Sequence, residues 1–165
     1  MSTLAPPISV LITGGTRRVG LAIARAFANE YRGLHLILTT RDLGAAAASA
    51  KRELESLGAT VAVERLDTGD LTAMDAFAQS ISRSRESLDA LILNASSYDE
   101  TPLAPLRAAD LERHMRVNAF GPVLLARGLL GCLSICPRPQ GAGIVAMTDM
   151  HVLGRPRKNL LAYSM

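Results

Sequence analysis

The sequence has 165 residues, a net charge of +3 and a pI near 9.2; 48% of its residues are hydrophobic and only 4% are aromatic. This length suits one domain with a substantial core, and the composition is typical of an α/β protein whose strands are buried on both faces. The scattered basic residues favour small anionic ligands over nucleic acid. Because the sequence has neither a signal peptide nor a membrane span, we expect a cytoplasmic protein. Cys132 and Cys136 are predicted to be reduced thiols, and no metal site is expected.

Apolar runs and helical periodicity alternate along the whole chain. Buried strands are predicted at residues 8–13, 34–40, 60–66, 88–93 and 144–148. Helices are predicted at 19–29, 43–57, 71–82 and 109–130, with another beginning at Leu160. In the first helix, the packed face should consist of residues 19, 22, 23, 26 and 27. This alternation predicts a Rossmann-type doubly wound parallel sheet, strand order 3-2-1-4-5, within a single domain over residues 1–165.

The turn after the first strand carries the strongest signal of a binding site. Gly14 and Gly15 permit a tight turn, and Gly20 lets the following helix approach the strand closely. A helix N-terminus offers unpaired N–H groups and partial positive charge, which suits a phosphate. Arg17 and Arg18 oppose the helix dipole at about 0.3–1 kcal/mol each, a cost that an anion bound there would offset.

The turn Thr13–Gly20 has the pattern T-G-x-x-x-R-x-G. It resembles the T-G-x-x-x-G-x-G turn of short-chain dehydrogenases/reductases, with Arg18 in place of the middle glycine, as in the pteridine reductase branch. The resemblance extends over most of the chain and implies a nucleotide cofactor. The cofactor-binding residues that it implies are Thr13, Gly14, Gly15, Arg17, Arg18, Val19, Gly20, Thr40, Arg41, Asp67, Asn94, Ala95 and Ser96.

The end of the second strand bears on the choice of cofactor. Thr40 and Arg41 stand where an acidic residue would bind the ribose 2′-hydroxyl of NAD, and Arg17 can approach the same ribose. A 2′-phosphate suits these cations, so NADP(H) is expected over NAD(H), although Asp42 lies next to Arg41. Asp67, after the third strand, resembles the acid of the family that accepts a hydrogen bond from the adenine amino group.

The segment after the fourth strand implies a substrate class. Asn94-Ala95-Ser96-Ser97 followed by Tyr98 resembles the N-A-S-S-aromatic segment of pteridine reductases. In that branch the aromatic residue, here Tyr98, stacks on the pterin ring, and the residues here numbered Ser96 and Arg18 contact pterin and phosphate. The resemblance therefore implies hydride transfer to a pterin or dihydrofolate C=N bond.

Three further residues resemble the catalytic set of the family. Tyr163 matches the tyrosine of the Y-x-x-x-K motif and is the candidate general acid, and Asn118 matches the helix asparagine that holds a water in the proton path. Pteridine reductases carry aspartate at the family's serine position, which favours Asp149. Strict spacing places Met150 there instead, so the register between the two residues is open.

Alternative interpretations remain at this stage. A reductase of another carbonyl, such as a 3-oxoacyl thioester, shares the fold. A methyltransferase would need an acidic residue after the second strand, and Thr40 and Arg41 argue against it. The lysine of the motif would follow Met165 by two residues, which suggests a chain lacking the C-terminal strands and helices of the family. In that case the chain alone would be a catalytically dead nucleotide-binding fragment that folds poorly, while the full-length form would be a homo-oligomer.

Overall fold

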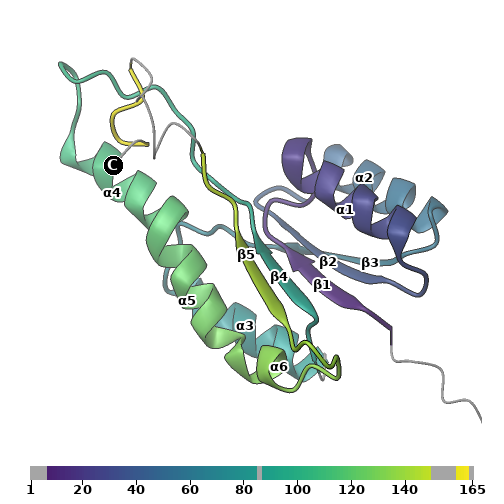
Figure 1. The fold of residues 1–165 in the computed structure, drawn as a ribbon. Helices are drawn as coiled ribbons and strands as arrows, with labels where there is room; N and C mark the ends of the chain where they lie inside the picture. Colours follow the sequence, from purple (N-terminus) through teal and green to yellow (C-terminus); the bar gives the residue numbers. More distant parts are fainter. Residues whose placement is uncertain (1–6, 85–86, 150–158, 164–165) are drawn as a thin grey trace, which may run out of the picture.

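The computed structural model describes residues 7–84, 87–149 and 159–163, and it contains one parallel sheet (Figure 1). The order is β3-β2-β1-β4-β5, with every neighbouring pair parallel, which confirms the predicted topology. Because all strands are parallel, their carboxyl ends lie at the same edge of the sheet, and each crossover places a helix on one of its faces. The strands are β1 (Ser9–Ile12), β2 (His35–Thr40), β3 (Thr60–Arg65), β4 (Ala90–Leu93) and β5 (Gly143–Ala146).

Helices cover both faces of the sheet. Figure 1 shows α1 and α2 on one face and α3, α5 and α6 on the other. Two apolar cores result, one around Leu11 and Leu91 under α3 and α5, the other around Ile12 and Leu36 under α1 and α2. The helices are α1 (Arg18–Glu30), α2 (Ala45–Ser56), α3 (Ala73–Ser84), α4 (Ala108–Met115), α5 (Gly121–Gly128) and α6 (Leu130–Ser134), with a π-helical turn at Arg116–Phe120.

The predicted packed face of the first helix is wrong in part. Gly20, Ala24 and Ala28 are the buried residues of α1, while Val19 is 55% exposed. Small residues bring this helix close to the sheet, because a Cβ on Gly20 would overlap the carbonyl oxygen of Gly14. Ile23 and Phe27 of the predicted face are partly buried and pack against this core, so the prediction holds for them, while the small residues make the closest contact.

The long helix predicted at residues 109–130 is present, but it is not regular throughout. Helical residues run without a gap from Ala108 to Gly128 through α4, the π-helical turn and α5, and α6 follows from Leu130. Pro122 has no N–H to bond the carbonyl of residue 118, and its ring would crowd that carbonyl in a regular α-helix; the wider turn before it relieves this conflict. A Cβ on Gly121 would overlap the carbonyl oxygen of Thr68, so the helix lies directly against the loop after β3.

Residues 160–163, the described part of the helix predicted to begin at Leu160, are not helical. Leu160 forms a parallel bridge with Thr101, and residues 161–163 form a turn. β5 occupies the edge of the sheet, where Ile144 and Val145 are each nearly half exposed. Within the described residues, no helix has the length and apolar character needed to cross a membrane.

Candidate functional site

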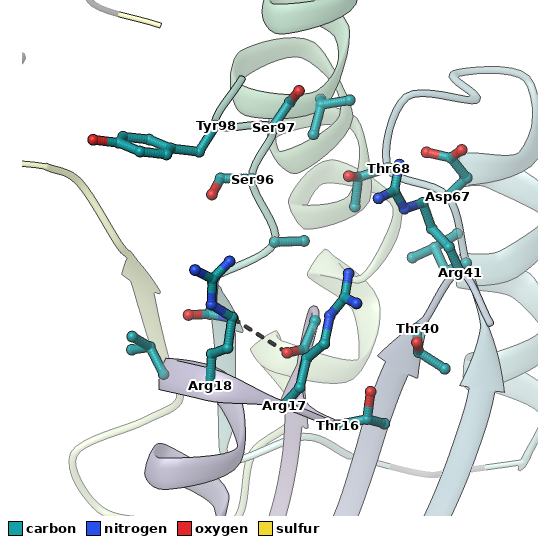
Figure 2. Close-up of a pocket in the computed structure, with 17 residues that line it drawn as sticks. Thr16, Arg17, Arg18, Thr40, Arg41, Asp67, Thr68, Ser96, Ser97 and Tyr98 are labelled. Carbon is teal, nitrogen blue, oxygen red and sulfur yellow. Dashed lines mark hydrogen bonds between the residues drawn. The ribbon is translucent and has the colours of Figure 1, made fainter. Parts of the chain in front are cut away.

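A cavity of about 340 Å³ opens at the carboxyl ends of the strands (Figure 2). Loops following β1 to β4 meet here, as expected for a doubly wound sheet at the point where strand order reverses. Its residues come from the turn after β1, the ends of β2 and β3, the segment after β4 and the π-helical turn. They are Gly14, Thr16, Arg17, Arg18, Val19, Gly20, Thr40, Arg41, Leu66, Asp67, Thr68, Asn94, Ala95, Ser96, Ser97, Tyr98 and Val117.

The floor of the cavity is fixed by hydrogen bonds between the ends of β1 and β4. The Thr13 hydroxyl oxygen accepts the N–H groups of Asn94 and Ala95, each at 2.9 Å. The side-chain amide of Asn94 donates to the Thr13 carbonyl at 2.9 Å. Thr13 is buried and does not line the cavity, so its role is to join the two loops.

The turn after β1 has an unusual backbone at Arg18. Gly14 has φ +64°, in the left-handed region where glycine is favoured, but Arg18 also has φ +51°. Arg18 stands where the resembled family turn has its middle glycine, and its backbone has a conformation that favours glycine. Figure 2 shows the Arg18 side chain directed toward the loop that carries Ser96.

Three guanidinium groups give the cavity a positive character. Arg17, Arg18 and Arg41 line it, and none of them forms an ion pair within the described part of the chain. The carboxylate of Asp42 lies outside the cavity and accepts the Gly44 N–H at 2.9 Å, just before α2. An anionic ligand would therefore meet the arginines without direct competition from this acid.

Asp67 and the segment after β4 are each held by hydrogen bonds to nearby groups. Asp67 lines the cavity, and one of its oxygens accepts the Gly69 N–H at 2.9 Å. Asn118, in the π-helical turn, accepts the Ser97 N–H at 2.7 Å and donates to the Ser97 carbonyl at 3.0 Å. This paired contact fixes the backbone one residue before Tyr98.

The two candidate catalytic side chains meet beside the cavity. The Tyr163 hydroxyl donates to Asp149 Oδ2 at 3.4 Å, and its ring packs edge to face against Tyr98 with a centroid distance of 4.7 Å. Burial raises the pKa of the Tyr163 phenol above its usual value, and the negative charge of Asp149 adds to the effect. The phenol thus keeps its proton at neutral pH. Met150 lies outside the described residues.

His114 is a further polar group near these tyrosines. It is 1% exposed, and its ring lies 6.5 Å from that of Tyr163. Neither ring nitrogen has a hydrogen-bond partner among the described residues. Burial lowers the pKa of the imidazole, and the charge of Arg113 acts in the same direction. His114 is therefore neutral at neutral pH.

Most of the residues suggested by the sequence gather at this edge of the sheet. Thr13 and Gly15 lie just beneath the cavity, and Asn118 holds the backbone of the loop that follows β4. Asp149 and Tyr163 lie beyond Tyr98. The sequence reasoning missed five lining residues, and the strand-end rule could have found at least Thr16 and Thr68, which follow β1 and β3 closely. The missed residues are Thr16, Leu66, Thr68, Ser97 and Val117. In the described part of the chain, no three metal-ligating side chains cluster together.

Fold and cavity together are typical of a nucleotide-binding doubly wound α/β protein. The short chain dehydrogenase family matches residues 9–164, nearly the whole sequence. The chain therefore belongs to the short-chain dehydrogenase family.

Two individual relatives match this chain with moderate identity over part of their own length. Galactitol 2-dehydrogenase from Agrobacterium fabrum is 29% identical over 139 residues, 84% of this chain and 51% of that protein. Protochlorophyllide reductase A from Oryza sativa subsp. japonica is 38% identical over 132 residues, 79% of this chain and 34% of that protein. The chain thus spans about half the length of the first relative and a third of the second.

Solved structures share the fold. A metagenomic short-chain oxidoreductase in complex with NADP is 25% identical, with a TM-score of 0.83, over 95% of this chain and 68% of that one. A 3-oxoacyl (acyl-carrier-protein) reductase from Agrobacterium tumefaciens C58 with NADP bound is 24% identical, with a TM-score of 0.82, over 95% of this chain and 58% of that one.

Proposed function

We propose that this protein is an NADPH-dependent reductase that transfers hydride to a planar C=N substrate of the pterin or dihydrofolate type. One observation carries the proposal. Arg18, Ser96 and Tyr98 line the same cavity, and the hydrogen-bonded Asp149–Tyr163 pair lies beside Tyr98. The first three residues would contact the substrate, and the pair would supply a proton to it.

The cofactor half of the proposal is supported by shape and charge. Gly20 packs closely against the Gly14 carbonyl, which brings the helix N-terminus next to the end of β1, where a pyrophosphate binds in proteins of this fold. Arg17 and Arg41, without ion-pair partners in the described part of the chain, suit a ribose 2′-phosphate. Asp67 would accept the adenine amino group. The metagenomic relative with NADP is consistent with this assignment.

The chemistry of the second half follows from Tyr163. Bound NADPH supplies hydride, and the heteroatom of the reduced bond then needs a proton. Tyr163 carries its phenol proton at neutral pH and is the proposed donor. Burial and the charge of Asp149 raise its pKa, which makes the phenol a weaker acid, so proton donation would depend on its position beside the substrate. Asp149 orients the phenol, and the edge-to-face contact with Tyr98 places the phenol beside the ring on which a flat substrate would stack.

A second candidate is reduction of a simple carbonyl. Its support is the names of the relatives, which include a galactitol dehydrogenase and a 3-oxoacyl reductase. Such substrates need the tyrosine but gain nothing from Arg18 or from the Tyr98 ring.

Cofactor titration tests the first half on the 165-residue chain. NADPH should bind at least tenfold more tightly than NADH, a difference of about 1.4 kcal/mol. Arg41→Asp should reverse the preference, while Arg52→Asp, the same charge change on α2 outside the cavity, should leave it intact. Equal binding of the two cofactors to the unchanged chain would refute the role of the arginines.

Substrate assays test the second half. NADPH oxidation should occur with dihydrobiopterin or dihydrofolate, and Tyr98→Ala should weaken pterin binding at least tenfold while NADPH binding stays the same. Tyr98→Phe keeps the ring and serves as the control. Turnover of an acetoacetyl thioester without response to any pterin would favour the carbonyl candidate.

A further inference from the structure

Thr101 joins the segment that carries Tyr163 to the loop that carries Tyr98. Its N–H donates to the Asn159 carbonyl at 2.6 Å, and its hydroxyl oxygen accepts the Ala162 N–H at 2.9 Å. The two segments also form a parallel bridge through Leu160. In Figure 1 the yellow end of the described chain lies beside the loop that follows β4.

These contacts are shielded from water. Thr101 is 4% exposed, and Leu160 and Ala162 are 5% exposed each. A buried N–H group left without an acceptor is costly, so the Ala162 amide depends on the Thr101 hydroxyl. Ala162 directly precedes Tyr163, and Thr101 follows Tyr98 by three residues. The hydroxyl therefore fixes the backbone on both sides of the edge-to-face tyrosine pair.

From this geometry we infer that Thr101 is a positioning residue, whose hydroxyl holds the phenol of Tyr163 against the Tyr98 ring in the orientation needed for proton transfer. The inference rests on the proposed role of Tyr163 as the acid. Thr101 does not line the cofactor cavity, and it touches no reacting group itself. Its loss should thus affect proton transfer without affecting cofactor binding.

The decisive comparison is Thr101→Val against Thr101→Ser. Valine keeps the branched shape and removes the acceptor, whereas serine keeps the acceptor. Thr60→Val makes the same chemical change at the exposed start of β3, at the opposite end of the sheet, and controls for the loss of a hydroxyl in itself.

The first readout needs no turnover. The chain has three tyrosines, so tyrosine-selective ¹³C labelling gives three signals, assigned by Tyr→Phe exchange at positions 31 and 98. The Tyr98–Tyr163 ring cross-peaks should be present in the unchanged chain, in Thr101→Ser and in Thr60→Val, and lost in Thr101→Val. Unchanged cross-peaks in Thr101→Val would overturn the inference.

The second readout is the rate. Thr101→Val should lower kcat at least tenfold with the Kd for NADPH within twofold of the unchanged protein, and Thr101→Ser should restore kcat. A protein that shows the cross-peaks but reduces no substrate would refute the proposed function and leave the positioning role supported. If Thr101→Val does not fold, amide exchange at Ala162 in the unchanged chain decides: slow exchange supports the inference, and exchange as fast as in an open loop overturns it.

Discussion

Arg18 combines two unfavourable features, and replacing it should raise stability while weakening ligand binding. Its φ of +51° lies in the left-handed region, which costs a non-glycine residue about 1–2 kcal/mol. Its charge at the start of α1 opposes the helix dipole by about 0.3–1 kcal/mol. Glycine removes both costs, but it lowers the free energy of unfolding by about 0.4–1 kcal/mol because it increases the conformational freedom of the unfolded chain. Arg18→Gly should therefore stabilise the protein by about 1 kcal/mol.

The matched variant Arg18→Ala separates the two features, since alanine removes the charge and keeps the strained backbone. We expect the free energy of unfolding to rank glycine above alanine and alanine slightly above arginine. A gain of 1 kcal/mol corresponds to a rise in Tm of about 2–4 °C for a chain of this length.

Urea titration of the three proteins without cofactor measures this order, and fluorescence titration measures NADPH binding. Both variants should bind NADPH about tenfold or more weakly, because a hydrogen bond to a charged group contributes about 1.5–3 kcal/mol. Equal stability of the glycine and alanine variants would refute the strain at Arg18. Unchanged NADPH affinity in both would refute its role as an anion ligand.

Two further predictions concern the interior. The pKa of His114 is lower in the folded protein than in the unfolded chain, so the unfolded chain takes up a proton at a higher pH. The free energy of unfolding should therefore fall as the pH drops below about 6.5. His114→Leu should reduce this loss in urea titrations at pH 5 and pH 7, and an equal loss in both proteins would contradict the assignment. Gly121→Ala should lower the free energy of unfolding by about 1–3 kcal/mol, because its Cβ would overlap the Thr68 carbonyl. Gly131→Ala, in open space on α6, should cost nothing, and similar losses in both would argue against close packing at Gly121.

The sheet was predictable because its evidence is local. Each strand is a short apolar run with turn residues at its ends, and the rule for right-handed crossovers then leaves few strand orders. The sequence-based predictions that were wrong concern features that tertiary contacts determine. Which face of α1 is buried depends on how closely Gly20 approaches the turn after β1, and sequence periodicity does not predict this distance. The π-helical turn within the predicted long helix lies just before Pro122 and the contact of Gly121 with Thr68, and helical periodicity indicates neither.

The candidate site divides in the same way. Residues at strand ends, such as Arg41 and Asp67, could be expected at the cavity because parallel strands end at one edge. His114 gave no such signal, since a histidine within a helical pattern does not reveal whether it is buried or paired. Thr101 lay in a loop between two motifs, and its contact with Ala162 joins residues 61 positions apart.

The two halves of the site are supported by different contacts, and this has a consequence for how each responds to change. The cavity floor is held by Thr13 and Asn94 at the ends of neighbouring strands, where the ladder itself fixes their distance. The Tyr98–Tyr163 pair has no such ladder: it is held by the Asn118 contacts to Ser97 on one side and by Thr101 on the other. Local opening of loops costs less free energy than opening of a central strand. Cofactor binding should therefore persist under conditions that already disturb the tyrosine pair, whereas disturbing β1 or β4 must affect both.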